Sequence, residues 1–218
     1  MFSPCLDILP TPQRLLWNEL SATPDDFTLY GGTAVALRLG HRHSVDFDFF
    51  SCLPFQSDRL IASIPYLTGA DVRQSAANTL TVSIERDGQV KVSYFGALPL
   101  GQVLAYEAVQ GPNFAVASLL DLSGTKVAVV TQRAELKDYL DIHALLTTGK
   151  IPLSEMLSAA KIIYGETFNP LISMKAISYF EDEALQELPL TMRNDLLAAV
   201  KKTDPKSLPK LQAIRQRP

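Results

Sequence analysis

The sequence is poor in several kinds of residue, and each shortage argues against a class of protein. Only two cysteines and three histidines occur in 218 residues, which argues against a disulfide framework or a cysteine-rich zinc site. No apolar run approaches the roughly 20 residues that span a bilayer. The first residues also lack the basic segment and apolar run of a signal peptide. We therefore expect a soluble, cytoplasmic protein that does not contact a membrane.

Positive charge is also limited. The formal net charge is −3, so we do not expect nucleic-acid binding over the whole surface, although a local basic patch stays open. Hydrophobic residues make up 47% of the chain and charged residues 20%, which predicts a sizeable folded core. A chain of 218 residues suits one large domain or one domain with a helical extension.

The apolar pattern predicts mixed strands and helices up to about residue 116 and helices from there on. The expected strands are 27–30, 45–50, 79–85 and 90–95, and the expected helices are 11–20, 34–39, 57–64, 118–133, 135–146 and several after 152. The run 127–130 is rich in valine and also suits a strand. We therefore expect an α+β fold, with a mixed β-sheet core and flanking helices over residues 1–116 and a helical C-terminal region over residues 117–218.

Two aspartates stand in the apolar strand expected at 45–50. Residues i and i+2 of a strand point to the same face, so Asp46 and Asp48 lie side by side while Val45, Phe47 and Phe49 face a core. Aspartate is unfavourable in strands, and adjacent carboxylates repel unless a cation lies between them. Because carboxylate oxygens suit Mg²⁺ or Mn²⁺, we expect this pair to bind such a metal ion. The alternative is an edge strand whose polar residues face water.

A phosphate site is expected beside these carboxylates, at Gly31, Gly32 and Thr33. Glycines permit close approach of the backbone, and the start of the following helix adds positive potential. The Thr33 hydroxyl can also donate to a phosphate oxygen. Together with Asp46 and Asp48, this segment predicts a pocket for a metal-bound nucleoside triphosphate. The alternative is an ordinary tight turn with an N-cap threonine.

A His-Arg-His segment precedes the aspartates. We expect the side chain of Arg42 to meet a phosphate or to pair with the aspartates. His41 and His43 beside Asp-x-Asp would also suit a zinc hydrolase, since imidazole and carboxylate both bind zinc. Their spacing matches no established zinc motif.

The ordered motifs resemble the nucleotidyltransferase superfamily, whose signature is Gly-Gly or Gly-Ser, a short helix and then Asp-x-Asp. More closely, they are similar to the AbiEii/AbiGii toxin-type nucleotidyltransferase family, in which a helical lysine is followed by an arginine and a Lys-Asp-x-x-Asp helix. The corresponding residues here are Lys126, Arg133, Lys137, Asp138 and Asp141. The resemblance covers about residues 27–146.

The resemblance implies a nucleotidyltransferase fold whose helical C-terminal region completes the active site. It implies an enzyme that moves a nucleoside monophosphate from a nucleoside triphosphate (NTP) to a hydroxyl on a tRNA or a protein, with Mg²⁺ or Mn²⁺. It also implies that the protein is the toxin of a toxin–antitoxin pair and that a cognate antitoxin restrains it.

The helical half contributes further candidate residues. Lys126 falls within the apolar stripe of its expected helix, where a lysine must snorkel or find an anionic partner, and the resemblance favours the triphosphate. Asp138 and Asp141 share one helix side, which on the residues alone suits a solvated face, with Lys137 pairing with Asp141. The resemblance instead makes Asp138 a catalytic residue that holds Lys126, orients the nucleotide or acts as a base. It places Asp141, Lys137 and Arg133 at the nucleotide or the acceptor.

One position departs from the superfamily pattern. Members often carry a third carboxylate on the strand after the hairpin, where this sequence has Ser93. Either one metal ion suffices, or a second ion takes more water, or Glu85 or Asp87 on the hairpin compensates. The departure leaves an alternative function open, namely a catalytically degenerate nucleotide-binding module with a regulatory or interaction role.

Overall fold

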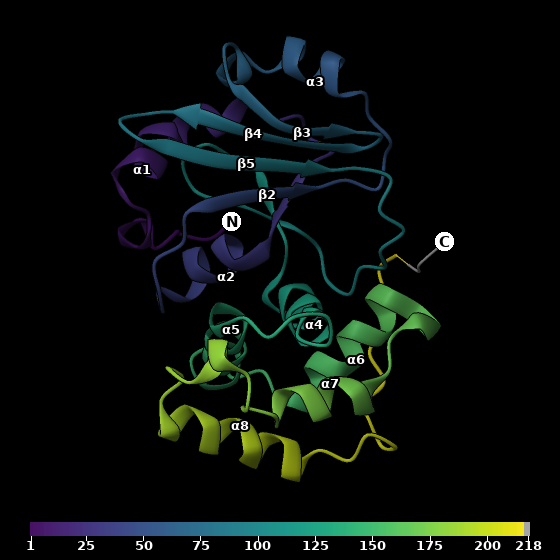
Figure 1. Ribbon diagram of the computed structural model, residues 1–218. Coiled ribbons are helices and arrows are strands. Elements are labelled where there is room, and N and C mark those ends of the chain that lie inside the picture. Colours follow the sequence, from purple (N-terminus) through teal and green to yellow (C-terminus); the bar gives the residue numbers. More distant parts are fainter. Residues whose placement is uncertain (216–218) are drawn as a thin grey trace. The chain divides into compact units, whose positions relative to one another are not determined.

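The computed structural model describes residues 1–215 and contains two compact units; Figure 1 labels their α-helices and the strands β2 to β5. The first unit comprises Met1–Pro99 and Tyr106–Ala117. The second comprises Leu100–Ala105 and the chain from Ser118 onwards. The sequence-based division at residue 116 into a core and a region that completes the active site stays a prediction.

A seven-stranded mixed sheet forms the first unit, in the order β3-β4-β5-β2-β1-β7-β6. At its centre, β2 (Asp46–Phe50) pairs antiparallel with β1 (Thr28–Tyr30) and parallel with β5 (Gln89–Phe95). The other strands are β3 (Asp71–Ala76), β4 (Thr79–Glu85), β6 (Glu107–Ala108) and β7 (Ala115–Val116). The expected α+β fold with a mixed sheet is confirmed, although three of these strands were not predicted.

The alternation of buried and accessible side chains along β2 explains the position of the aspartates. Phe47 and Phe49 are fully buried, whereas Asp46 and Asp48 on the opposite face stay partly accessible. The two phenylalanines pack against other aromatic rings of the core, which fixes the register of the strand. The prediction for Val45 was wrong: this residue precedes the strand and is 50% exposed.

The helix between β1 and β2 starts earlier than predicted. Helix α2 (Gly31–Leu39) includes both glycines in its first turn, with Tyr30 at the N-cap position. Gly40 ends the helix as predicted, with a φ of 65° and its N–H donating to the carbonyl oxygen of Ala36 at 2.8 Å. The strand β1 thus passes directly into a helix that contacts β1 and β2.

Shorter helical elements complete the first unit. They are η1 (Leu6–Ile8), α1 (Thr11–Trp17), η2 (Asn18–Ala22), α3 (Ser57–Ser63) and η3 (Pro65–Leu67). The helix expected at 11–20 is therefore divided into an α-helix and a 3₁₀-helix. Helix α1 contacts β5, the strand that neighbours β2.

Helices form the second unit, as predicted. They are α4 (Leu119–Val129), α5 (Leu136–Thr147), α6 (Leu153–Tyr164), η4 (Gly165–Thr167), α7 (Pro170–Ile177), η5 (Glu183–Leu185) and α8 (Leu190–Lys202). Ser118 caps α4 by accepting from the N–H of Asp121 at 3.0 Å. Gly124 lets α4 and α6 approach closely, because a Cβ there would lie 2.8 Å from the Ala160 nitrogen. The valine-rich run that also suited a strand is helical up to Val129.

Within residues 1–215, no helix has the length and apolar character needed to cross a bilayer.

Candidate active site

The Gly-Gly and Asp-x-Asp motifs form one structural feature. Strands β1 and β2 place Tyr30 opposite Asp48, so the first turn of α2 begins beside that carboxylate. Gly31 has a φ of +74°, which is unfavourable for other residues, and a Cβ there would lie 2.9 Å from Oδ2 of Asp48. A side chain at Gly31 would therefore be strained and would also collide with Asp48. The glycine keeps the start of α2 against the carboxylate.

Thr33 joins the start of α2 to the start of β2. Its side-chain hydroxyl is buried, donates to the backbone carbonyl oxygen of Asp46 and lies 2.7 Å from the Ser44 hydroxyl. Thr33 is not the N-cap residue, because Tyr30 occupies that position. The expected donation from the Thr33 hydroxyl to a phosphate would require its bond to Asp46 to break. In this structure the hydroxyl orients the backbone that carries Asp46.

The sequence interpretation missed Lys91, which contacts Asp46. The parallel register of β2 and β5 pairs Asp46 with Lys91, and the Lys91 ammonium Nζ lies 2.9 Å from the Asp46 carboxylate oxygen Oδ2. Both side chains are partly exposed, Lys91 at 49% and Asp46 at 29%. The alternation of Lys91 with buried Val90 and Val92 indicated its face, but only the pairing of distant strands shows its partner.

The position expected for a third carboxylate is beside Asp48. Ser93 pairs with Asp48 in the strand register and is buried. Glu85 does not compensate, because its carboxylate accepts from the N–H of Gly88 at 2.7 Å and from the side chain of Gln89. Gln89 precedes Ser93 by four residues, about 13 Å along the strand. In the described part of the chain, no three His, Cys, Asp or Glu side chains form a group that could hold a metal ion.

Backbone contacts hold the segment before β2. Arg42 donates through Nη1 to the carbonyl oxygen of His43 at 2.9 Å, and Nδ1 of His43 lies 3.2 Å from the carbonyl oxygen of Ile8. The Ser44 N–H also donates to Ile8 at 3.1 Å. The expected contact of Arg42 with a phosphate stays a prediction.

Aromatic rings continue the sheet face that carries Asp48. Tyr30 lies opposite Asp48, and its ring stacks on that of Phe50 with 4.8 Å between centroids and 13° between planes. Phe95 pairs with Phe50 in the strand register and meets its ring edge-on at 5.5 Å. Phe50 and Phe95 are only partly buried. The carboxylates therefore lie next to an aromatic surface that the sequence interpretation missed.

Lys126 in the second unit is buried between two carboxylates. Its side chain is 5% exposed, and its Nζ lies 2.7 Å from Oδ1 of Asp138 and 2.7 Å from Oδ2 of Asp141. Both carboxylates are fully buried. The snorkelling alternative for Lys126 and the solvated-face alternative for Asp138 and Asp141 are therefore wrong. The expected pairing of Asp138 with Lys126 is confirmed as a contact, whereas the catalytic roles of these residues stay predictions.

One further cation contacts this cluster. Arg133 donates from Nε to Oδ2 of Asp138 at 2.9 Å. The positive charges of Lys126 and Arg133 therefore match the negative charges of the two aspartates. The expected pair between Lys137 and Asp141 is wrong: Lys137 lies 3.0 Å from Glu135, which also pairs with Arg133 at 3.0 Å. Asp141 faces inward on α5, whereas Lys137 is exposed. An ammonium has three N–H donors, and the two carboxylates engage two of those of Lys126.

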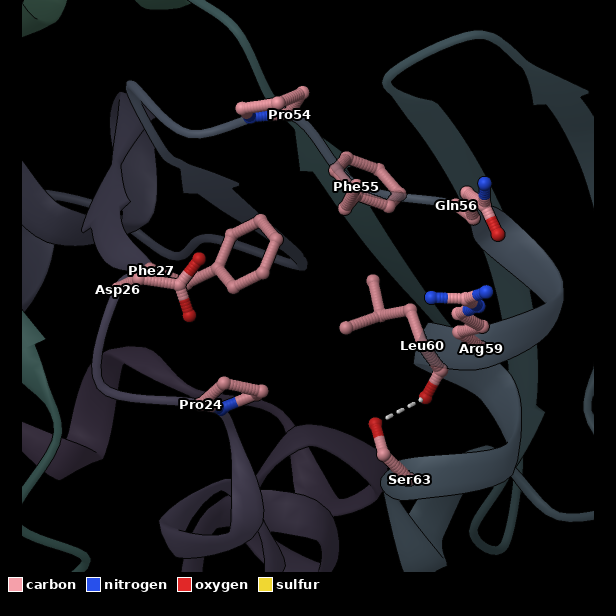
Figure 2. Close-up of a pocket in the computed structure, with 9 residues that line it drawn as sticks. All are labelled: Pro24, Asp26, Phe27, Pro54, Phe55, Gln56, Arg59, Leu60 and Ser63. Carbon is pink, nitrogen blue, oxygen red and sulfur yellow. Dashed lines mark hydrogen bonds between the residues drawn. The ribbon is translucent and has the colours of Figure 1, made fainter.

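A separate pocket lies elsewhere in the first unit (Figure 2). It has a volume of about 520 Å³, and both apolar and polar side chains line it. The lining residues are Pro24, Asp26, Phe27, Pro54, Phe55, Gln56, Arg59, Leu60 and Ser63. None of the expected nucleotide or metal residues is among them. The pocket adjoins the start of β1 and the segment after β2, whereas Gly31 adjoins the end of β1.

Solved structures identify the fold. MenT4, a nucleotidyltransferase toxin from Mycobacterium tuberculosis H37Rv, superposes with a TM-score of 0.57 at 15% identity, over 88% of this chain and 82% of that chain. A candidate nucleotidyltransferase from H. pylori superposes with a TM-score of 0.53 at 17% identity, over 87% of this chain and 90% of that one. The protein therefore has a nucleotidyltransferase fold.

Sequence comparison gives the family. The chain belongs to the family of AbiEii nucleotidyl transferase toxins of type IV toxin–antitoxin systems, whose model matches residues 14–217. It is also 30% identical over 166 residues to an uncharacterized protein from Aquifex aeolicus (strain VF5), covering 72% of this chain and 75% of that protein. The resemblance inferred from the motifs is thus confirmed over a longer range than the motifs themselves.

Proposed function

We propose that this protein transfers a nucleoside monophosphate from an NTP to a hydroxyl on a tRNA or a protein. The observation that carries the proposal is the contact between Gly31 and Asp48, which joins a helix start to a carboxylate pair. Family membership supports the reaction class and the role of toxin. A cognate antitoxin would then restrain the protein, and the cytoplasm would supply both NTP and acceptor.

The residues at this site fit a divalent metal ion. Asp46 and Asp48 are partly accessible carboxylates on one strand face, and the missing side chain of Gly31 leaves space at Oδ2 of Asp48. Mg²⁺ is commonly bound through one or two carboxylates together with substrate phosphates. Asp46 and Asp48 would hold the ion. When bound, Mg²⁺ or Mn²⁺ neutralises charge on the triphosphate and polarises the phosphoryl group under attack.

The chain itself would orient the reactants. The first N–H groups of α2, at Gly31, Gly32 and Thr33, suit phosphate oxygens, because a helix start offers unpaired donors and positive potential. The partly accessible rings of the aromatic surface, Phe50 and Phe95, suit stacking of the base. In the reaction the acceptor oxygen bonds to the α-phosphorus, the bond from that phosphorus to the bridging oxygen breaks, and pyrophosphate leaves. The proton of the acceptor hydroxyl passes to water.

Nucleotide roles for the second unit are part of the proposal. Lys126 retains donor capacity beyond its two carboxylates, which supports a contact with the triphosphate. Among the three expected roles of Asp138, its contacts favour holding Lys126, because its two oxygens already accept from Lys126 and Arg133. The roles of Arg133, Lys137 and Asp141 at the nucleotide or the acceptor rest on family membership.

Labelling with radioactive NTP tests the proposal. The protein is incubated with each labelled triphosphate, Mg²⁺ and a whole-cell extract, and the RNA and protein fractions are then counted separately. We expect one fraction to be labelled by the wild type and not by Asp48→Asn. The matched control is Asp71→Asn, which removes an exposed carboxylate of β3 that pairs with Arg73 at 3.1 Å. Equal labelling by the wild type and Asp48→Asn would contradict the metal role.

A second function is favoured by one observation. On the strand beside Asp46 and Asp48, Lys91 places an ammonium opposite Asp46, and Ser93 stands where superfamily members often have a carboxylate. This arrangement suits a nucleotide-binding module without transferase activity. Calorimetric binding of NTP with Mg²⁺, without label transfer to either fraction, would favour this function.

A further inference from the structure

The face that carries Asp46 and Asp48 already contains a cation. Lys91 is the single lysine among residues 1–117, and it stands opposite Asp46 on the adjacent strand. Its ammonium lies 2.9 Å from Oδ2 of Asp46, the carboxylate proposed above as a metal ligand. Ser93, opposite Asp48, adds no charge. Any metal ion that binds through both aspartates must therefore share Asp46 with the ammonium or displace it.

We propose that Lys91 is a resident counter-cation that competes with the divalent metal ion for Asp46 and so weakens metal binding in the absence of nucleotide. This inference rests on the proposed function, because it assumes that Asp46 and Asp48 hold the ion. It assigns Lys91 a positioning role: the ammonium holds Asp46 while no nucleotide is present. Triphosphate, which brings further negative charge, then shifts the balance toward the metal ion.

The backbone at Lys91 is fixed while its side chain can move, and this role needs both. Its neighbours Val90 and Val92 are fully buried, so the backbone of β5 is fixed beside β2. The side chain itself is half exposed and its stem is flexible, so the ammonium can leave Asp46 without unpacking the core. A partly exposed ion pair contributes little to stability, so a divalent ion can displace the ammonium.

A simpler explanation is a cross-strand ion pair that only stabilises the sheet. The two explanations differ in what happens to metal binding when the ammonium is removed. A purely structural pair would lower the stability of the first unit and leave metal affinity unchanged or weaker. A competing cation would leave the metal site stronger after its removal, because a repulsive charge and a rival for Oδ2 both disappear.

Titration with Mn²⁺ alone, on the full chain without nucleotide, separates these explanations. Free Mn²⁺ is measured by electron paramagnetic resonance for the wild type and for Lys91→Met, Lys91→Arg and Arg73→Met. We expect Lys91→Met to bind Mn²⁺ about ten-fold more tightly, as expected when a unit charge is removed within about 5 Å of the ion. Lys91→Arg keeps the charge and should behave as the wild type. Arg73→Met removes a cation that pairs with Asp71 elsewhere on the same sheet and should also have no effect.

A double-mutant cycle with Asp46→Asn makes the test specific. If Lys91 competes for Asp46, Lys91→Met should raise Mn²⁺ affinity less in the Asp46→Asn background than in the wild type, because only the charge repulsion is then relieved. Equal or weaker binding by Lys91→Met than by the wild type, with an unchanged thermal transition, would overturn the inference and leave the proposed function intact. Absence of Mn²⁺ binding in both proteins would overturn the metal site itself and the inference with it.

Discussion

Removing the charge of Lys126 should unfold the second unit more easily. The substitution Lys126→Met keeps the unbranched stem and most of its volume but removes the ammonium. Asp138 and Asp141 are fully buried, and each carboxylate lies 2.7 Å from that ammonium. Breaking a buried ion pair on one side costs about 3–5 kcal/mol, because the opposite charge stays in a poorly solvated place. Typical domains are stable by only about 5–15 kcal/mol, so the loss is a large part of the total.

Urea unfolding gives the measurement. Far-UV circular dichroism at about 222 nm follows all the helices, most of whose residues lie in the second unit. A urea slope of about 2 kcal/mol/M predicts a midpoint lower by about 1.5–2.5 M. The chain has one tryptophan, Trp17 in α1, so its fluorescence reports the first unit separately. We expect the larger shift in the circular dichroism signal.

Two variants control for trivial effects. Lys161→Met removes an exposed lysine of α6 and should leave the midpoint within experimental error. The triple variant Lys126→Met, Asp138→Asn, Asp141→Asn removes the whole buried set of charges and should recover most of the lost stability. A midpoint for Lys126→Met equal to that of the wild type would refute the argument. The same experiment decides how loss of transfer in a Lys126 variant is interpreted, since an unfolded helical unit would also abolish activity.

Three further predictions follow from single sites. Expression of the wild type should slow growth and expression of Asp48→Asn at the same protein level should not, because the toxin needs its metal ligand. Gly31→Ala should weaken triphosphate binding at least ten-fold and lower the free energy of unfolding by about 1–3 kcal/mol, because backbone strain and a collision with Asp48 combine. Calorimetry measures the binding, and thermal unfolding measures the stability. Burial, with two nearby carboxylates, raises the pKa of Tyr139 to about 12, so its contribution to stability is present below pH 10 and is lost as the pH rises toward 12. At about pH 11 the wild type should lose about 1.4 kcal/mol more than Tyr139→Phe, relative to each protein at pH 8.

Each of these predictions has a matched comparison. Gly69→Ala is the control for Gly31→Ala, since Gly69 has a φ of +75° and open space around it and should show strain alone. Equal triphosphate affinity in both glycine variants would contradict the role of Gly31. Equal growth with the wild type and Asp48→Asn would remove the toxin role and leave nucleotide transfer untouched. Parallel stability curves for the wild type and Tyr139→Phe between pH 9 and 11.5 would show that Tyr139 titrates normally.

Local signals explain the elements that the sequence predicted well. The hairpin between β4 and β5 follows from Asp87 and Gly88, which adopt the positive φ values of 56° and 131° that few other residues tolerate. The start of α4 follows from the side chain of Ser118. By contrast, β3 was missed because every residue in it is exposed, so it carries no alternation of apolar and polar residues. Gly31 and Gly32 indicated a turn because glycine is a poor helix former, whereas both lie in the first turn of α2, Gly31 with a φ of +74°.

At the site, too, the sequence predicted what depends on neighbouring residues and missed what depends on the pairing of distant strands. The spacing of Asp46 and Asp48 places two carboxylates on one face whatever the neighbouring strand is, so the metal hypothesis needed no tertiary structure. The partner of Asp46 depends on the parallel register of β2 with β5, whose paired positions lie 45 residues apart along the chain. A parallel pair has no hairpin turn to fix its register, so nothing near Lys91 in the sequence reveals that it faces a carboxylate. The net charge of this site, and with it the expected metal affinity, therefore depends on how the strands pair in the sheet. The two carboxylates, by contrast, share one face because of their spacing within a single strand.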